Sequence, residues 1–192
     1  MGVNLTSQFV NDKLDSLIDF SHPDASLKIA NLCAKNKIAY VMGTTGMTEA
    51  QLNEVRSLST QIPILIGSNM SIGVNLLFKF AAQIAKALGD EFDIEIIEKH
   101  HRFKKDAPSG TALSIAESIA KEIKRDLKEV AINGREGQTG ERTQKEIGIH
   151  AIRAGDIVGE HTIIYGALGE TIELTHKAHT RDTFASGAVK AS

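Results

Sequence analysis

The first third of the chain alternates short apolar runs with polar, helix-like stretches. The apolar runs have the length and composition of buried strands and cover Leu14–Phe20, Ile38–Met42 and Ile62–Ile66. Between the first two runs we expect a helix with Ser21 as its cap and Pro23 in its first turn, ending near Asn36. Between the next two we expect a second helix that begins at Thr48 and turns Leu52 inward. This alternation favours a doubly wound parallel α/β sheet.

Two polar turns interrupt this pattern after the second and third apolar runs. They are Gly43-Thr44-Thr45-Gly46 and Gly67-Ser68-Asn69-Met70. Ligands of open parallel sheets bind at the carboxyl ends of the strands, so both turns are candidate binding sites. The same residue types are also typical of ordinary turns, and composition alone does not separate the two interpretations.

From Gly73 onward the periodicity changes and predicts an α+β region with a mostly antiparallel or mixed sheet. A helix with one apolar face that includes Leu77 and Phe80 is expected to stop at Gly89 and to bridge two domains. The later elements are a strand at Phe92–Glu98, a helix at Thr111–Leu127, strands at Gly148–Arg153, Val158–Tyr165 and Thr171–Thr175, and a helix at Thr183–Ala191. The glycine-rich, charged segment Gly134–Gln144 is expected to be a mobile loop.

Composition excludes several classes of partner. The 22 Lys and Arg against 24 Asp and Glu give a net charge of -2, which offers no electrostatic reason to expect nucleic acid or an anionic membrane. Cys33 is the single cysteine, so no internal disulfide is possible and a reducing compartment is expected. No apolar run approaches the roughly 20 residues of a spanning helix. We therefore expect a cytoplasmic protein.

The segment Glu98–Ala112 carries the strongest chemical signal. It places five potential cations directly after a predicted strand, namely His100, His101, Arg102, Lys104 and Lys105. Ser109-Gly110-Thr111 then opens a helix, whose first N–H groups and positive dipole end favour a bound anion. A histidine supplies a proton near neutral pH, and like charges beside Lys104 can lower its pKa toward useful acid strength. The pattern predicts proton donation beside a substrate with more than one carboxylate.

Other interpretations of this segment remain open on the residues alone. A basic loop is often only a solvated face. Glu98 and His100 share one side of the strand and could begin a metal site, but His101 faces the other way and no third ligand stands at zinc spacing, so we expect no metal. Ser109 could be a nucleophile, yet no G-x-S-x-G motif surrounds it and a serine before a helix is more often a cap.

The run E-x-H-H-x-x-K-x-D-A-P-S-G-T-A, from Glu98 to Ala112, is similar to the signature of the dihydrodipicolinate reductases. Further blocks resemble this family in the family's own order, so the resemblance extends over essentially the whole chain. They are IDFSHPDA from Ile18, GTTG from Gly43, SNMSIGVN from Ser68, RAGDIVGEHT from Arg153 and ELTHKA from Glu173.

The resemblance implies a reductase that uses NADPH or NADH to reduce a cyclic dicarboxylate to tetrahydrodipicolinate in lysine and diaminopimelate synthesis. It implies that His100 is the proton donor or acceptor and Lys104 a second proton donor. The positions that hold the substrate carboxylates are then His101, Ser109, Gly110 and Thr111. The cofactor-contacting positions are Gly43, Thr44, Thr45, Gly67, Ser68, Asn69 and Met70.

The resemblance also implies a domain organisation. Residues 1–72 correspond to part of a Rossmann-like dinucleotide-binding domain, to which residues 180–192 return, and residues 73–179 to a substrate-binding domain that builds a homotetramer. Family members begin with a glycine-rich G-x-x-G-x-x-G turn, which this sequence lacks along with about two βα units, and they continue beyond Ala191. We therefore expect a piece of a longer enzyme, and the alternatives are a non-catalytic oligomerisation module or a related imine or semialdehyde reductase.

Overall fold

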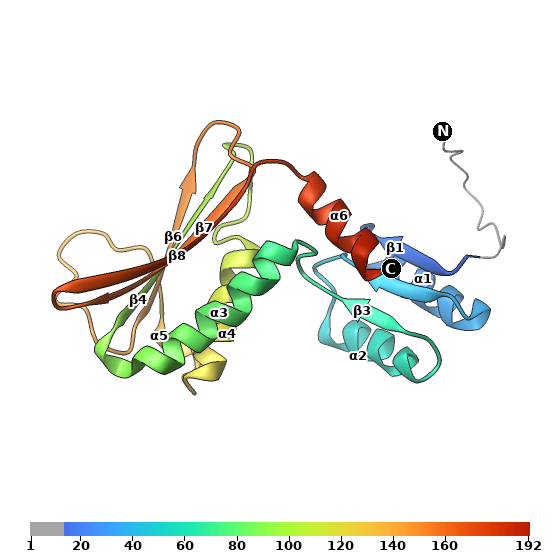
Figure 1. The fold of residues 1–192 in the computed structure, drawn as a ribbon, viewed down its shortest axis with the longest axis horizontal. Helices are drawn as coiled ribbons and strands as arrows, with labels where there is room; N and C mark the ends of the chain where they lie inside the picture. Colours follow the sequence, from blue (N-terminus) through green and yellow to red (C-terminus); the bar gives the residue numbers. More distant parts are fainter. Residues whose placement is uncertain (1–13) are drawn as a thin grey trace. The chain divides into compact units, whose positions relative to one another are not determined.

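The computed structural model describes residues 14–192, which form two compact units (Figure 1). The described residues through Ser68, together with Ala188–Ser192, form the first unit, and Asn69–Gly187 form the second. The final helix, α6 (Asp182–Ala191), begins in the second unit and ends in the first.

The first unit is a three-stranded parallel sheet with two helices. Its elements in chain order are β1 (Ser16–Asp19), α1 (Pro23–Asn36), β2 (Ala39–Met42), α2 (Glu49–Ser57), the 3-10 turn η1 (Leu58–Thr60) and β3 (Ile64–Ile66). The strands lie in the order β1-β2-β3, which confirms the alternation predicted from the sequence. Cys33, Tyr40, Met42 and Val55 are buried between the sheet and the helices.

The two helix starts in this unit differ in their caps. Thr48 caps α2 through a reciprocal capping box with Gln51, as its position in the sequence suggests. The expected cap of α1, Ser21, is wrong, because His22 occupies that position and makes no side-chain hydrogen bond there. The backbone N–H of Ser21 instead donates to Asp19 and Thr44, which draws this residue toward the end of β1.

The second unit is a five-stranded mixed sheet with helices on one face. Its elements are α3 (Ile72–Leu88), η2 (Gly89–Glu91), β4 (Asp93–His100), α4 (Gly110–Glu122), α5 (Leu127–Val130), β5 (Ala131–Asn133), β6 (Ile147–Arg153), β7 (Gly159–Ala167) and β8 (Glu170–Ala178). The strand order is β5-β6-β4-β7-β8. β4 is the central strand, parallel to β6 and antiparallel to β7.

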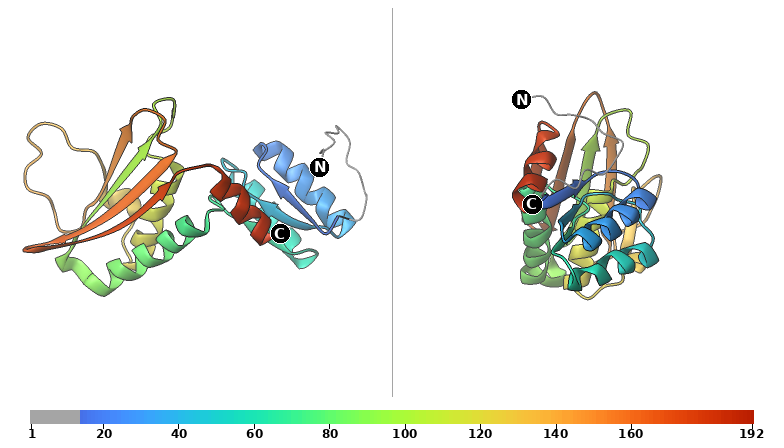
Figure 2. Two further views of the ribbon diagram at one scale, coloured as in Figure 1. Left: turned by 45° about the horizontal axis from the view of Figure 1, so that its top comes forward. Right: turned by 90° about the vertical axis from the view of Figure 1, so that its right-hand side faces the viewer.

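Helices α3 and α4 cover one face of this sheet (Figure 2). The core between them contains Leu77 and Ala81 of α3, Ile115 and Ile119 of α4, and Tyr165 of β7. Tyr165 donates a hydrogen bond from its hydroxyl to the Ala81 carbonyl oxygen, so its one polar atom is satisfied.

Two expectations for this unit are wrong. Phe80 lies off the buried face of α3, with 45% of its surface exposed. The expected helix Thr111–Leu127 breaks after Glu122, because Lys124 adopts a left-handed conformation and a separate helix, α5, follows. Among the described residues, Ile72–Glu91 is long and apolar enough to cross a membrane by length and composition alone, although Lys79 and Lys86 interrupt its apolar residues. This is weak evidence, because core helices of soluble proteins pass the same test.

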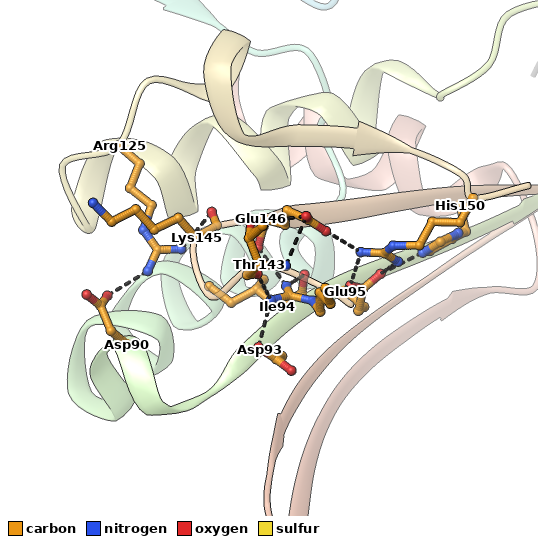
Figure 3. Close-up of polar contacts among 11 residues, drawn as sticks. Asp90, Asp93, Ile94, Glu95, Arg125, Thr143, Lys145, Glu146 and His150 are labelled. Carbon is orange, nitrogen blue, oxygen red and sulfur yellow. Dashed lines mark hydrogen bonds and ion pairs between the residues drawn. The ribbon is translucent and has the colours of Figure 1, made fainter. Parts of the chain in front are cut away.

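The glycine-rich loop between β5 and β6 has no regular structure, as expected, but its arginines are tied to the sheet (Figure 3). Arg135 makes two hydrogen bonds to the Glu95 carboxylate, and Arg142 bonds both Glu95 and Asp93. His150 reaches Glu95 from β6 at 2.6 Å. We call Glu95, Arg135, Arg142, Glu146 and His150 the loop clasp.

Candidate functional site in the second unit

The site begins where β4 ends and α4 starts. Along β4, Ile94, Ile96 and Glu98 alternate onto the buried face, so a carboxylate occupies the next inward position of an apolar series. Glu98 has no exposed surface. His100 follows on the same side, and the strand extends two residues further than the sequence pattern suggested, so this histidine lies on β4 itself.

Glu98 is surrounded by hydrogen-bond donors. Arg153 donates from both terminal nitrogens, at 2.8 and 2.7 Å, and the Ser109 backbone N–H donates at 3.0 Å. His100 Nδ1 lies 2.6 Å from Glu98 Oε2. Burial alone would raise the pKa of Glu98, but the hydrogen bonds from Arg153 and His100 outweigh it and hold the pKa below the ordinary value. The carboxylate is therefore ionised at neutral pH.

A second histidine lies behind His100. His161 of β7 is 4% exposed, and its ring meets the ring of His100 edge to face with centroids 5.2 Å apart. Its Nε2 is 3.1 Å from the Ser109 hydroxyl oxygen. Burial, followed by the charge of His100, lowers the pKa of His161 to about 4, so this ring is neutral near pH 7.

Ser109 serves the start of α4. Its hydroxyl oxygen accepts from the Ala112 backbone N–H at 3.2 Å, which confirms the capping interpretation. Its own N–H donates to Glu98, and only 2% of the residue is exposed. The expectation that the Ser109 N–H faces a ligand is therefore wrong. Gly110, in contrast, is exposed and has open space on its Cβ side.

Lys104 and His101 lie on the loop between β4 and α4. The Lys104 ammonium pairs with Asp106 at 2.8 Å, so an opposite charge lies beside it as well as the like charges of Arg102 and Lys105. His101 is partly buried, and its Nδ1 has no hydrogen-bond partner within residues 14–192. The loop is fixed to the end of β6, because Arg153 donates to the Asp106 carbonyl oxygen at 2.7 Å.

Thr111, in the first turn of α4, is also near a residue from the expected cofactor set. Its hydroxyl oxygen accepts a hydrogen bond from the Asn69 side-chain amide at 3.2 Å. Asn69 in turn accepts from the Ser71 N–H and so orders the turn that precedes α3. Met70, in the same turn, is 6% exposed.

The remaining expected cofactor positions lie in the first unit, at the carboxyl ends of neighbouring strands. Gly43, Thr44 and Thr45 follow β2, while Gly67 and Ser68 follow β3, and the Gly67 N–H donates to the Met42 carbonyl oxygen. Thr45 is exposed, but Thr44 is buried and its hydroxyl accepts from the Ser21 N–H.

The buried residue Asp19, at the end of β1, helps to order the turn after β2. It accepts hydrogen bonds from the hydroxyls of Tyr40 and Ser26 and from the Ser21 N–H, while the Asp19 carbonyl oxygen accepts from Gly43. Burial opposes ionisation, but these hydrogen bonds lower the pKa of Asp19 below its ordinary value. The turn after β2 is thus held to the end of β1 by ordered polar groups.

Of the six positions assigned to catalysis and substrate binding, His100 and Ser109 both contact Glu98, and Lys104 pairs with Asp106, whose carbonyl oxygen is held by Arg153. Thr111 contacts Asn69, while His101 and Gly110 lie on the same segment, directly after β4 and at the start of α4. The residues we missed are Glu98, Arg153 and His161. The signal for two of them was present, because the block RAGDIVGEHT begins with Arg153 and contains His161. Within the described chain, no group of three His, Cys, Asp or Glu side chains is arranged to hold a metal ion.

Comparison with known proteins gives consistent matches. Residues 1–70 match the family model described as dihydrodipicolinate reductase, N-terminus, and residues 73–192 the model described as dihydrodipicolinate reductase, C-terminus. The 4-hydroxy-tetrahydrodipicolinate reductase of Hahella chejuensis is 52% identical over 95% of this chain and 68% of its own length. That of Syntrophus aciditrophicus is 49% identical over 93% of this chain and 66% of its own length.

A solved structure agrees with these matches. The dipicolinate-bound dihydrodipicolinate reductase from Paenisporosarcina sp. TG-14 superimposes with a TM-score of 0.71 at 31% identity, covering 91% of this chain and 66% of that protein. The chain thus spans about two thirds of the length of all three proteins.

Proposed function

This chain belongs to the dihydrodipicolinate reductase family, and we propose that it carries the substrate site and part of the cofactor site of an NAD(P)H-dependent 4-hydroxy-tetrahydrodipicolinate reductase of lysine and diaminopimelate synthesis. The observation that carries the proposal is an ionised Glu98 that contacts His100 and the N–H of Ser109 at the start of α4, with Lys104 held nearby through Asp106 and Arg153. The enzyme is proposed to act in the cytoplasm.

The substrate is proposed to bind through its carboxylates. The first turn of α4 offers the N–H groups of Gly110 and Thr111 and the positive end of a 13-residue helix, which suits a carboxylate. His101 and the Thr111 hydroxyl supply further donors. Ser109 acts indirectly, because its hydroxyl orders the turn and contacts His161. His100 and Lys104 are the groups that deliver protons as charge develops on the substrate ring.

The cofactor would be held by the turns after β2 and β3. Gly43, Thr45, Gly67 and Ser68 lie at the carboxyl ends of parallel strands, where nucleotides bind in such sheets. The buried Thr44 hydroxyl is already engaged by Ser21, so this residue is proposed to contribute through its backbone. NADPH or NADH supplies the hydride when bound. Asn69 and Met70 are proposed to complete the cofactor set.

The function is tested by supplying the purified chain with enzymatically generated substrate and either nicotinamide. We expect saturable oxidation of the reduced cofactor, competitively inhibited by pyridine-2,6-dicarboxylate. Calorimetric binding of this dicarboxylate is a second measurement that does not depend on turnover. Absence of both binding and turnover would reject the proposal for this chain and favour an oligomerisation module.

Thr111→Val should weaken dicarboxylate binding by about 1–2 kcal/mol, because one hydrogen bond to a charged group is lost. Thr111→Ser keeps the hydroxyl and is the matched control, with affinity expected close to that of the parent chain. Calorimetric titration of both variants with pyridine-2,6-dicarboxylate makes the comparison. Equal affinities for the valine and serine variants would remove the Thr111 hydroxyl from the site.

The oligomer is proposed to be a homotetramer assembled through the sheet of the second unit. Ile152 of β6 and Ile172 of β8 are 43% and 37% exposed, and within residues 14–192 the edge strands β5 and β8 each pair with a strand on one side only. Light scattering at working concentration should give a mass near four chains. A monodisperse monomer would contradict the proposal.

A further inference from the structure

A buried ion pair lies directly behind the proposed proton donor. Glu98 is fully buried, yet it is ionised. It accepts two hydrogen bonds from Arg153, whose side chain is 20% exposed. Buried ion pairs contribute little net stability, because desolvation offsets the attraction, and apolar residues of similar size often stabilise as well. The position of this charge therefore suggests a role beyond holding the fold.

Glu98 determines which nitrogen of His100 carries the hydrogen. An ionised carboxylate only accepts hydrogen bonds, so His100 Nδ1, 2.6 Å from Glu98 Oε2, must be the N–H nitrogen. Nε2 is then the nitrogen left for proton exchange with substrate. This edge of the ring faces Gly159, where an added Cβ would lie 3.2 Å from Nε2, so the glycine leaves this nitrogen free of a neighbouring side chain.

Within residues 14–192, Glu98 is the one anionic side chain in direct contact with His100. Arg153 from β6 and Lys104 from the following loop both disfavour an imidazolium, and His161 from β7 is neutral. Burial acts in the same direction and lowers the pKa of His100, whereas the hydrogen bond and charge of Glu98 raise it. Without Glu98, the ring would face two cations in a half-buried place, and its protonated form would be lost.

We propose that Glu98, held by Arg153, is a positioning residue for His100, which it keeps in the Nδ1–H tautomer and in a form that can be protonated. The proposal rests on the proposed function, in which His100 donates the proton. The same pair also orders Lys104 indirectly, because Arg153 holds the Asp106 carbonyl oxygen and the Asp106 carboxylate pairs with Lys104. The Ser109 N–H ties the start of α4 to the same carboxylate.

The first test is spectroscopic and needs no turnover. The ring nitrogens of His100 report tautomer and protonation through their 15N chemical shifts. In the parent chain we expect the Nδ1–H form, and in Glu98→Gln a mixture of tautomers with a lower pKa for His100. Glu160→Gln is the matched control. Glu160 of β7 pairs with Lys99 of the adjacent strand β4 at 3.3 Å, and its side chain is 24% exposed. An unchanged His100 spectrum in Glu98→Gln would overturn the proposal.

The second test is kinetic. Glu98→Gln should lower kcat by about 10- to 100-fold with less than about 3-fold change in KM, because the proton donor is mispositioned while the carboxylate contacts remain. The alkaline limb of the kcat profile should move to lower pH, since a smaller fraction of His100 is protonated at any given pH. If the parent chain neither turns over nor binds pyridine-2,6-dicarboxylate, the proposed function fails for this chain, and the 15N spectra still decide the positioning role.

Glu98→Gln leaves Arg153 without its charged partner and could destabilise the chain. The double variant Glu98→Gln/Arg153→Met removes both charges together and leaves no unpaired buried ion. We expect it to fold, to bind pyridine-2,6-dicarboxylate within about 3-fold of the parent, and to lose the fixed tautomer of His100. Retention of the fixed tautomer, or loss of the fold in both variants, would reduce this pair to a structural role and overturn the proposal.

Discussion

His100→Gln is expected to lower kcat by about 10²-fold or more, with a smaller change in KM. A proton donor contributes as charge develops on the substrate ring, whereas the proposed carboxylate contacts of Thr111 and His101 would be equal in the bound substrate and the transition state. Glutamine retains a polar side chain that can still bond Glu98, so the fold should survive. Steady-state kinetics of an enzyme preparation that turns over makes the measurement.

Two controls distinguish chemistry from folding in this experiment. His179→Gln makes the same change at an exposed position and should leave both kinetic constants unaltered. Pyridine-2,6-dicarboxylate should bind His100→Gln within about 3-fold of the parent chain, since the binding groups are retained. A kcat for His100→Gln within a factor of about 3 of the parent value would leave this loop as an anion-binding surface only.

Local sequence signals predicted the elements of the first unit well. Its strands are short apolar runs bounded by turns, and Thr48 with Gln51 forms a capping box that can be seen in the sequence. The prediction that Ser21 caps α1 was wrong, because the Ser21 N–H donates a hydrogen bond to Asp19 at the end of β1. Such competition depends on residues brought together by folding and has no local signature.

The second unit shows a different limit. The motif from Glu98 to Ala112 contains the proposed proton donors and correctly predicted the helix that begins after Ser109. The importance of Arg153 and His161 depends on β6 and β7 lying on either side of β4, a pairing that hydrophobic periodicity does not specify. β5 was missed because its three residues are too short to show a period. The partners of the Glu98 carboxylate on β6 and β7 therefore became visible only from the strand order.

The loop clasp illustrates the same limit and predicts a large effect on stability. Glu95 pairs with Gly148 in the register of β4 and β6, and an added Cβ on Gly148 would lie 1.8 Å from the Glu95 carboxylate. The glycine therefore leaves room for the carboxylate to lie across the neighbouring strand and meet Arg135, Arg142 and His150 (Figure 3). A glycine in a strand and two arginines in a polar loop gave no sign of this in the sequence.

Glu95→Gln should lower the free energy of unfolding of the second unit by about 2–3 kcal/mol at neutral pH. Burial opposes ionisation of Glu95, but hydrogen bonds from Arg135, His150 and Arg142 lower its pKa from 4.5 to about 2. Unfolding restores the ordinary pKa, so the stability that the ionised group confers is complete above about pH 5 and is lost as the pH falls toward 2. The parent chain and Glu95→Gln should therefore differ most near neutral pH and converge in acid.

Chemical denaturation between neutral pH and about pH 3, with amide exchange of β4 and β6 reporting the second unit, measures this difference. Glu122→Gln is the matched control, because Glu122 pairs with Lys86 at 2.6 Å at the surface, where solvent and salt screen the attraction. Its effect should be much smaller and sensitive to salt. A Glu95→Gln chain as stable as the parent at neutral pH, or a difference that persists undiminished in acid, would show that the clasp does not stabilise the unit through the charge of Glu95.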